Sequence, residues 1–162
     1  DGREYFFKSR EVFEQLIAEN ALIEYAQYVE NYYGTPKSYV EEQLLAGRDV
    51  ILEIEIQGAL KVKQQLPDTL LLFVAPPSAQ ELKNRLVGRG TESMDVIESR
   101  LERACEEAKG MESYDYLMIN DDLQECVQLM HSVIQDQHYR TKFNRSFAEN
   151  MARELNEMVK GE

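Results

Sequence analysis

The apolar residues of this chain change their spacing along its length, and each spacing predicts a type of element. Between Ser9 and Asn20 they recur every three or four positions, which predicts a helix with one apolar face, made of Val12, Phe13, Leu16 and Ile17. The other elements predicted in this part are a short strand over 4–7, a strand over 22–29, a turn-rich run over 31–36, and a helix that ends at Gly47. A capping box of Ser38 and Glu41 is expected to begin that last helix.

Three apolar runs in the rest of the chain predict buried strands. Val50–Ile56 is the clearest of them, since its only polar members are Glu53 and Glu55. Leu70–Ala75 is continuously apolar, as in a fully buried parallel strand, and Tyr116–Ile119 is a third buried strand. Helices are predicted between and after these strands, over 58–65, 78–87, 93–109, 122–135 and 140–159.

Boundary residues support several of these helices. Ser78 with Glu81 forms a second capping box, the run Gly88-Arg89-Gly90 breaks the helix that follows, and Asp122 is a helix cap. Strands that alternate with helices predict an α/β fold, with a parallel sheet covered by helices on both faces. In such sheets ligands bind at the carboxyl ends of strands, where Glu55, Pro76 and Asn120 lie.

Composition narrows the class of protein. The 162 residues fit one domain, with 43% hydrophobic and 30% charged residues and a formal charge of −12. The acidic balance argues against a general nucleic-acid or membrane-surface binder. No run of about 18 apolar residues and no signal peptide is visible, so a cytoplasmic protein is expected. Cys105 and Cys126 have no metal-ligand spacing and are interpreted as reduced thiols, His131 and His138 are given no role, and no metal site of the chain's own is predicted.

Charged residues at two places suggest chemistry. Glu53 and Glu55 lie two apart on a predicted strand, so their carboxylates share one face; they either contact a ligand or Mg²⁺-bound water, or lie partly exposed beside arginines. Arg85 and Arg89 are four apart on a predicted helix, and Arg100 follows on the next helix with Arg103 nearby. Arginines suit phosphoryl transfer because they make bidentate contacts to phosphate. Two arginines without further context, however, are more often ordinary solvated side chains.

Four blocks of sequence resemble bacterial guanylate kinase in order and spacing. They are ENYYGTP at 30–36, VILEIEIQG at 50–58, PPSAQELKNRLVGRGTES at 76–93 and YLMINDD at 116–122. The resemblance implies the P-loop nucleoside-monophosphate-kinase fold and transfer of the ATP γ-phosphate to GMP with Mg²⁺, giving ADP and GDP. It also implies a GMP-binding subdomain over 1–38, core over 39–78, a mobile helical lid over 79–110, and core with C-terminal helices over 111–162.

The resemblance also implies roles for single residues. Glu24 matches the guanine-reading glutamate and Thr35 its hydroxyl partner: the carboxylate accepts from N1–H and the 2-amino group, and the hydroxyl donates to O6. Without the resemblance, Glu24 would be interpreted as a solvated surface residue. Tyr5 and Tyr33 match the tyrosines that bind the GMP phosphate, although aromatic core residues with surface hydroxyls would have the same pattern.

The remaining matches concern the acceptor, the lid and the donor. Glu55 matches a residue that contacts the acceptor nucleotide, and the match at Glu53 lies closer to the transferred phosphate. Arg85, Arg89 and Arg100 match lid arginines that close on ATP and GMP. Asn120 matches a residue beside the adenine of ATP, although an asparagine there is also a common turn former.

The chain departs from the family pattern at two points. Glu30 stands where the family commonly has glycine, which puts the local backbone and the placing of Tyr33 in question. No segment matches the phosphate loop G-x-x-x-x-G-K-[ST], which the family carries upstream of the point that corresponds to Asp1. We therefore expect a chain that is incomplete at its N-terminus, lacks the first strand and the P-loop, and is inactive alone.

Two alternatives stay open. A catalytically dead guanylate-kinase-like module that binds phosphopeptides would keep the acceptor pocket but tend to lose the lid arginines, which are retained here. A different nucleoside monophosphate kinase is disfavoured by Glu24 with Thr35. The charged final helix is interpreted as a solvated face or a contact between copies, so a homo-oligomer is left open.

Overall fold

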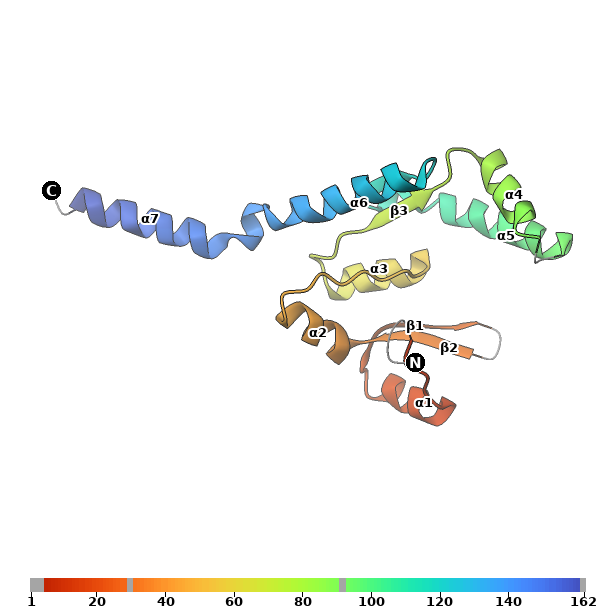
Figure 1. The fold of residues 1–162 in the computed structure, drawn as a ribbon. Coiled ribbons are helices and arrows are strands. Elements are labelled where there is room, and N and C mark those ends of the chain that lie inside the picture. Colours follow the sequence, from red (N-terminus) through yellow and green to blue (C-terminus); the bar gives the residue numbers. More distant parts are fainter. Residues whose placement is uncertain (1–4, 29–30, 91–92, 161–162) are drawn as a thin grey trace. The chain divides into compact units, whose positions relative to one another are not determined.

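The computed structural model describes residues 5–28, 31–90 and 93–160 (Figure 1). In chain order its elements are α1 Arg10–Ala18, β1 Leu22–Tyr28, β2 Asn31–Pro36, α2 Lys37–Leu45, α3 Ile56–Gln65, β3 Leu72–Ala75, α4 Ala79–Gly88, α5 Met94–Ala108, η1 Met111–Ser113, β4 Tyr116–Ile119, α6 Leu123–His138, η2 Thr141–Phe143 and α7 Arg145–Lys160. Contacts divide the chain into two compact units: the first is Asp1–Leu72 with Glu102–Tyr116, and the second is Phe73–Leu101 with Leu117–Glu162. The predicted subdomain boundaries differ from this division and stay predictions.

The first unit contains an antiparallel pair, β1 with β2. The turn-rich interpretation of 31–36 is therefore wrong: these residues form a strand opposite β1, with Gly34 beside Tyr25 and Thr35 beside Glu24. Gly34 permits this pairing, because a Cβ there would lie 2.8 Å from the Glu24 carbonyl oxygen and 2.9 Å from the Tyr25 Cβ. One aromatic residue of this strand packs on the helix α1, where the Phe13 and Tyr32 rings stack 5.2 Å apart.

The core of the first unit joins β1, α2 and α3 through Ile23, Val40 and Val62. The predicted strand over Val50–Ile56 is not one: 50–55 have no assigned structure and α3 already begins at Ile56. The segment nevertheless alternates as a strand would, with Val50, Leu52 and Ile54 packed against the core and the residues between them exposed. The apolar pattern therefore predicted correctly which residues are buried. The segment is not a strand, because no other strand among the described residues supplies a hydrogen-bonding partner.

Two predictions near the start of the first unit need correction. Tyr5–Phe7 form no strand, and Glu4 lies outside the described residues. The capping box at Ser38 is not formed either: Pro36, with φ −65°, occupies the N-cap of α2, so Ser38 lies inside the helix. By contrast, the helix pattern predicted from Ser9 is confirmed: Ser9 is the N-cap of α1, and its hydroxyl accepts from the Val12 amide.

Asp115 ties the end of the first unit together. Its Oδ2 accepts from the Leu71 amide at 2.8 Å and from the Lys63 ammonium at 2.9 Å, and Lys63 also donates to the Thr69 carbonyl. One carboxylate thus joins α3 to the chain just before β3.

The strands β3 and β4 pair in parallel. The Tyr116 amide donates to the Leu71 carbonyl and the Asn120 amide to the Ala75 carbonyl, so both partners advance in the same direction. The strands are less buried than predicted, since Val74, Leu117 and Ile119 are exposed while Ala75 and Met118 are buried. These pairings leave the side chains of 75 and 120 at the same end of the pair.

Helix boundaries in the second unit follow the predicted signals. Ser78 caps α4 by accepting from the Glu81 amide, and Asp122 caps α6 by accepting from the Glu125 amide. Gly90, with φ +63°, follows the end of α4. The last helix, α7, begins at Arg145 rather than at 140, and its apolar side chains, which include Phe147 and Leu155, are exposed.

No helix within the described ranges is both long and apolar enough to cross a membrane.

Candidate functional site

Among the described residues of the first unit, Glu24 is the charged residue that is buried. It is 7% exposed, although it lies on a strand beside two buried apolar residues, Leu22 and Ile23. A register shift explains this: Leu22 pairs with Pro36 and Glu24 with Thr35, so β1 holds one extra residue there. Such bulges redirect side chains, and three consecutive residues are buried here where simple alternation would expose one of them. The interpretation of Glu24 as a solvated surface residue is therefore wrong.

Thr35 supplies a partner for the buried carboxylate. Its Oγ1 donates to Glu24 Oε1 at 2.8 Å, directly across the β1–β2 pair. Since a buried carboxylate is costly without hydrogen bonds, this contact offsets part of the cost of burying Glu24. The structure thus brings together the two residues that were predicted to read one base.

The two predicted phosphate-binding tyrosines are both accessible. Tyr5 is 61% exposed and Tyr33 is 48% exposed, so neither is the aromatic core residue of the alternative interpretation. The Tyr5 ring lies 6.4 Å from that of Phe7. An exposed phenol can donate a hydrogen bond to an oxyanion, which keeps the predicted role open. Glu30, whose effect on Tyr33 was in question, lies outside the described residues.

Glu53 and Glu55 share the exposed side of the alternating segment before α3. Glu55 forms an ion pair with Arg103 on α5, and Arg103 also pairs with Glu107 one turn along, at 3.2 Å. Burial lowers the pKa of the Arg103 guanidinium, but the facing carboxylates of Glu55 and Glu107 outweigh it and raise that pKa overall. Both ends of the Glu55 pair are about half exposed, so its contribution to stability is small, about 0–1 kcal/mol.

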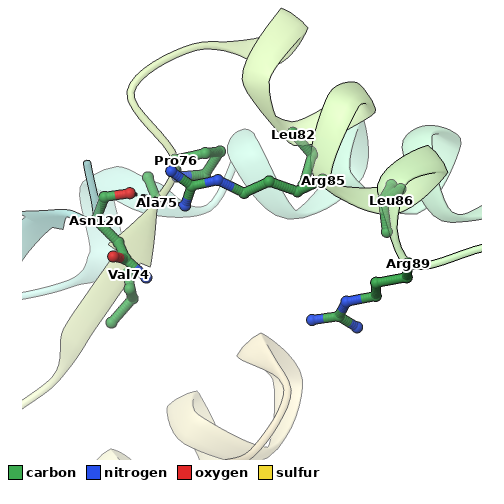
Figure 2. Close-up of a pocket in the computed structure, with 8 residues that line it drawn as sticks. All are labelled: Val74, Ala75, Pro76, Leu82, Arg85, Leu86, Arg89 and Asn120. Carbon is green, nitrogen blue, oxygen red and sulfur yellow. Dashed lines mark hydrogen bonds between the residues drawn. The ribbon is translucent and has the colours of Figure 1, made fainter. Parts of the chain in front are cut away.

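The second unit has a pocket of about 290 Å³ at the carboxyl ends of β3 and β4 (Figure 2). Arg85 reaches from α4 toward Asn120, and its Nη1 donates to the Asn120 carbonyl at 2.8 Å. Its Nε donates to Glu81 at 2.7 Å. These contacts fix the guanidinium while leaving it at the edge of the pocket, whose remaining walls are Val74, Ala75, Pro76, Leu82, Leu86 and Arg89.

The other two predicted lid arginines differ in their placement. Arg89, the C-cap of α4, lines the pocket and extends its guanidinium toward the same open side (Figure 2). Arg100 lies on α5, is exposed, and does not line this pocket. The pocket thus collects two cationic side chains and an asparagine at a strand end, the arrangement predicted for a nucleotide with phosphates.

Within the described part of the chain, no group of three or more histidine, cysteine or acidic side chains could hold a metal ion. Cys105 and Cys126 are free thiols.

Comparison with known proteins identifies the family of this chain. The model of the family described as guanylate kinase matches residues 1–137. The chain belongs to the guanylate kinase family. The guanylate kinase of Listeria innocua is 51% identical over 142 residues, which are 88% of this chain and 69% of that protein. The guanylate kinase of Streptococcus mutans is also 51% identical over 142 residues, 88% of this chain and 68% of that protein.

A solved structure supports the fold assignment. The crystal structure of guanylate kinase from Anaplasma phagocytophilum matches with a TM-score of 0.70 and 29% identity, over 87% of this chain and 69% of that one. The fold class predicted from the sequence, the α/β fold of nucleoside monophosphate kinases, is confirmed.

Two residues of this family member were missed as candidates. Arg103 was noted only as a neighbour of Arg100, and its spacing of four from Glu107 was the available sign of a helical ion pair. Gly58 follows the pair of glutamates by three residues and lies against Glu24, where a Cβ would come within 3.2 Å of Oε2. Nothing in the sequence around Gly58 indicates that it lies close to Glu24.

Proposed function

We propose that the chain carries the acceptor-binding and lid parts of an enzyme that transfers the γ-phosphate of ATP to GMP. The observation that carries the proposal is the buried Glu24 carboxylate, held by Thr35 on a bulged strand. A buried carboxylate with free lone pairs accepts from two adjacent donors, such as N1–H and the 2-amino group of guanine. Adenine has the opposite polarity at these positions, so AMP would leave buried groups unpaired.

The other residues take roles that suit their placement. Tyr5 and Tyr33 are exposed phenols that donate to the GMP phosphate, and Glu53 and Glu55 lie toward the acceptor and the transferred phosphate. Arg85 and Arg89 bind ATP phosphates at the edge of the pocket, beside Asn120. Arg100 acts with them on the charge that develops during transfer.

Mg²⁺ is proposed to arrive with ATP. It prefers oxygen ligands and is commonly held by nucleotide phosphates, water and one or two carboxylates, a set that the exposed carboxylate of Glu53 fits. Held by that carboxylate and the phosphates, the ion would neutralise charge on the phosphates. For a polypeptide of these 162 residues alone we propose GMP binding without turnover, because no residues in it match the phosphate-loop pattern.

We also propose a cytoplasmic location, with which the two free thiols agree.

Titration calorimetry tests the proposal, with GMP, AMP and IMP each added to the chain. We expect GMP to bind most tightly, IMP more weakly because it lacks the 2-amino group, and AMP most weakly. Tighter binding of AMP than of GMP would contradict it. Binding of a phosphoserine peptide in competition with GMP would favour a non-catalytic module instead.

A further inference from the structure

The end of the helix α5 is held against the start of α3 by two separate contacts. One is the ion pair of Arg103 with Glu55, in which the guanidinium meets Oε1 of the carboxylate. The other is apolar: Gly110, two residues past the end of α5, lies against Ile56, the first residue of α3. We propose that Arg103 is a positioning residue, which fixes the Glu55 carboxylate for the acceptor nucleotide and ties it to the helix that carries Arg100. This inference rests on the proposed function.

The carboxylate of Glu55 can take part in this contact because it does not cap its own helix. Glu55 is the N-cap of α3, with φ −69° and ψ 158°, but its side chain makes no capping hydrogen bond. The pair with Arg103 uses Oε1. Each oxygen of a carboxylate can accept hydrogen bonds, so Oε2 can accept from a ligand. The ion pair therefore orients Glu55 and still lets it bind.

The guanidinium of Arg103 is also held on its own helix. Its Nε donates to Oε1 of Glu107 at 3.2 Å, while Nη2 meets Glu55. Two carboxylates thus fix the plane of one guanidinium, an arrangement that the compact ammonium of a lysine cannot reproduce. Because both ends of the Glu55 pair are about half exposed, the pair adds little to the stability of the fold. We attribute its effect to the placing of side chains instead.

Gly110 provides the room for this arrangement. Its φ of −94° lies outside the left-handed region, so the backbone does not require glycine. A Cβ there would collide with Cδ1 of Ile56, the residue that follows Glu55. Glycine at this position therefore lets the turn after α5 approach the first turn of α3.

Arg103 lies close to the point where the chain passes from one compact unit to the other. Residues 102–116 belong to the first unit together with Glu55, whereas 73–101, which include Arg100, belong to the second. Arg100 and Arg103 are three positions apart in α5, and residues at that spacing are neighbours on a helix surface. The contact with Glu55 therefore fixes the direction in which this face of α5 points, at the turn next to Arg100.

Steady-state kinetics of an active, full-length form of the enzyme test the role of Arg103. We expect Arg103→Ala to raise KM for GMP about 10-fold, as for one lost hydrogen bond to a charged group. It should also lower kcat about 10-fold, because Arg100 is then less well placed. Arg103→Lys should recover only part of both losses. A merely structural role would lower kcat through loss of active enzyme and leave KM unchanged, and that result would overturn the inference.

Lys109→Ala is the matched control, because it removes the same charge from the same segment. Lys109 pairs with Glu106 at 2.7 Å, three positions away, and both side chains are well exposed. We expect KM and kcat of this variant to stay within about 2-fold of wild type, as for an exposed surface pair. Equal effects of Lys109→Ala and Arg103→Ala would show a general effect of charge and overturn the inference.

A double-mutant cycle separates positioning from direct contact with the nucleotide. Calorimetry would measure the affinity for GMP of Arg103→Ala, Glu55→Gln and the variant with both changes. If Arg103 acts through Glu55, the double variant loses little more than either single variant. If the two losses multiply, Arg103 acts on the nucleotide itself and the inference is overturned.

Gly110→Ala tests the apolar contact and offers its own rescue. We expect it to raise KM for GMP about 10-fold, because overpacking displaces the end of α5. Ile56→Val removes Cδ1, the atom that the new Cβ would meet. Gly110→Ala combined with Ile56→Val should therefore return to within about 3-fold of wild type. An unchanged KM in Gly110→Ala, or a rise that valine does not relieve, would overturn the role of Gly110.

A measurement without nucleotide keeps the inference separate from the proposed function. Nitrogen-15 NMR reports the rotation of an arginine guanidinium about its Nε–Cζ bond, which an ion pair slows. We expect slow rotation for Arg103 in the wild type and faster rotation in Glu55→Gln. Equal rates would overturn the contact. Should the full-length enzyme not phosphorylate GMP, the proposed function fails, and this comparison alone decides whether Arg103 holds Glu55.

Discussion

The guanidinium of Arg85 joins two sides of one pocket, because its Nη1 donates to the Asn120 carbonyl 2.8 Å away across the ends of α4 and β4. The same side chain pairs with Glu81 through Nε. A guanidinium has five N–H donors, so these two bonds leave others that can meet a phosphate. Arg85 is thus oriented by the protein rather than by a ligand.

Because Arg85 is held in this orientation, we predict that replacing it with alanine or with lysine weakens the binding of ATP. Arg85→Ala should weaken ATP about 10-fold, as for a lost charged hydrogen bond. Arg85→Lys should recover only part of that loss, since an ammonium lacks the planar fork that spans Asn120 and a phosphate. Titrating ATP against both variants in an active, full-length form of the enzyme measures the effect. The control is Glu81→Gln, which removes the helical pair but keeps the Asn120 contact and should stay within about 2-fold. A lysine variant that binds ATP as wild type does would contradict the prediction.

Arg100 is predicted to act mainly on the rate. In an active, full-length form of the enzyme, Arg100→Ala should lower kcat by about 10²-fold or more, because a lid arginine meets charge that develops in the transition state. Steady-state kinetics with varied GMP separate kcat from KM. A raised KM with kcat intact would make Arg100 a ground-state binder.

The sequence predicted those features of the structure that depend on neighbouring residues, and it failed where a feature depends on a distant segment of the chain. The ends of α4 and α6 follow from Ser78 and Asp122, since a cap contacts amides within its own turn. Val50–Ile56 has the pattern of a strand and buries alternate residues, yet it lacks a partner strand among the described residues, and pairing cannot be read from one segment. Asn31–Pro36 was mistaken for a turn because its partner, β1, decides its structure.

The same distinction applies to the candidate site. Residues with a chemical signature, such as Arg85 and Arg89, could be selected from spacing and are found together at one pocket. The burial of Glu24 could not be predicted from the sequence, because it depends on a bulge that adds one residue to β1 opposite β2. Gly58 escaped selection for a similar reason: it lies close to a residue 34 positions earlier in the chain.

Gly34 is predicted to be essential for the β1–β2 pair. A Cβ there would fall 2.8 Å from the Glu24 carbonyl oxygen and 3.0 Å from the Phe13 ring, closer than such atoms approach. Gly34→Ala should therefore lower the free energy of unfolding by about 1–3 kcal/mol, the usual cost of overpacking. Urea unfolding followed by circular dichroism measures it. Gly88→Ala should instead be neutral or stabilise by up to about 1 kcal/mol, as alanine favours a helix. Equal midpoints for the two variants would show that β2 can move away from β1.

Glu24 itself gives the most direct test of base choice. Glu24→Gln keeps the size of the side chain but replaces one acceptor oxygen with a donor amide, which would face guanine donors in a desolvated pocket. We expect GMP to lose at least about 2 kcal/mol of binding free energy. IMP lacks the 2-amino group and should lose less, so the preference for GMP over IMP narrows. Calorimetric titration of both ligands against wild type and variant provides the comparison. Equal losses for the two ligands, or no loss for either, would mean that the carboxylate buried beside Thr35 does not meet the edge of the base.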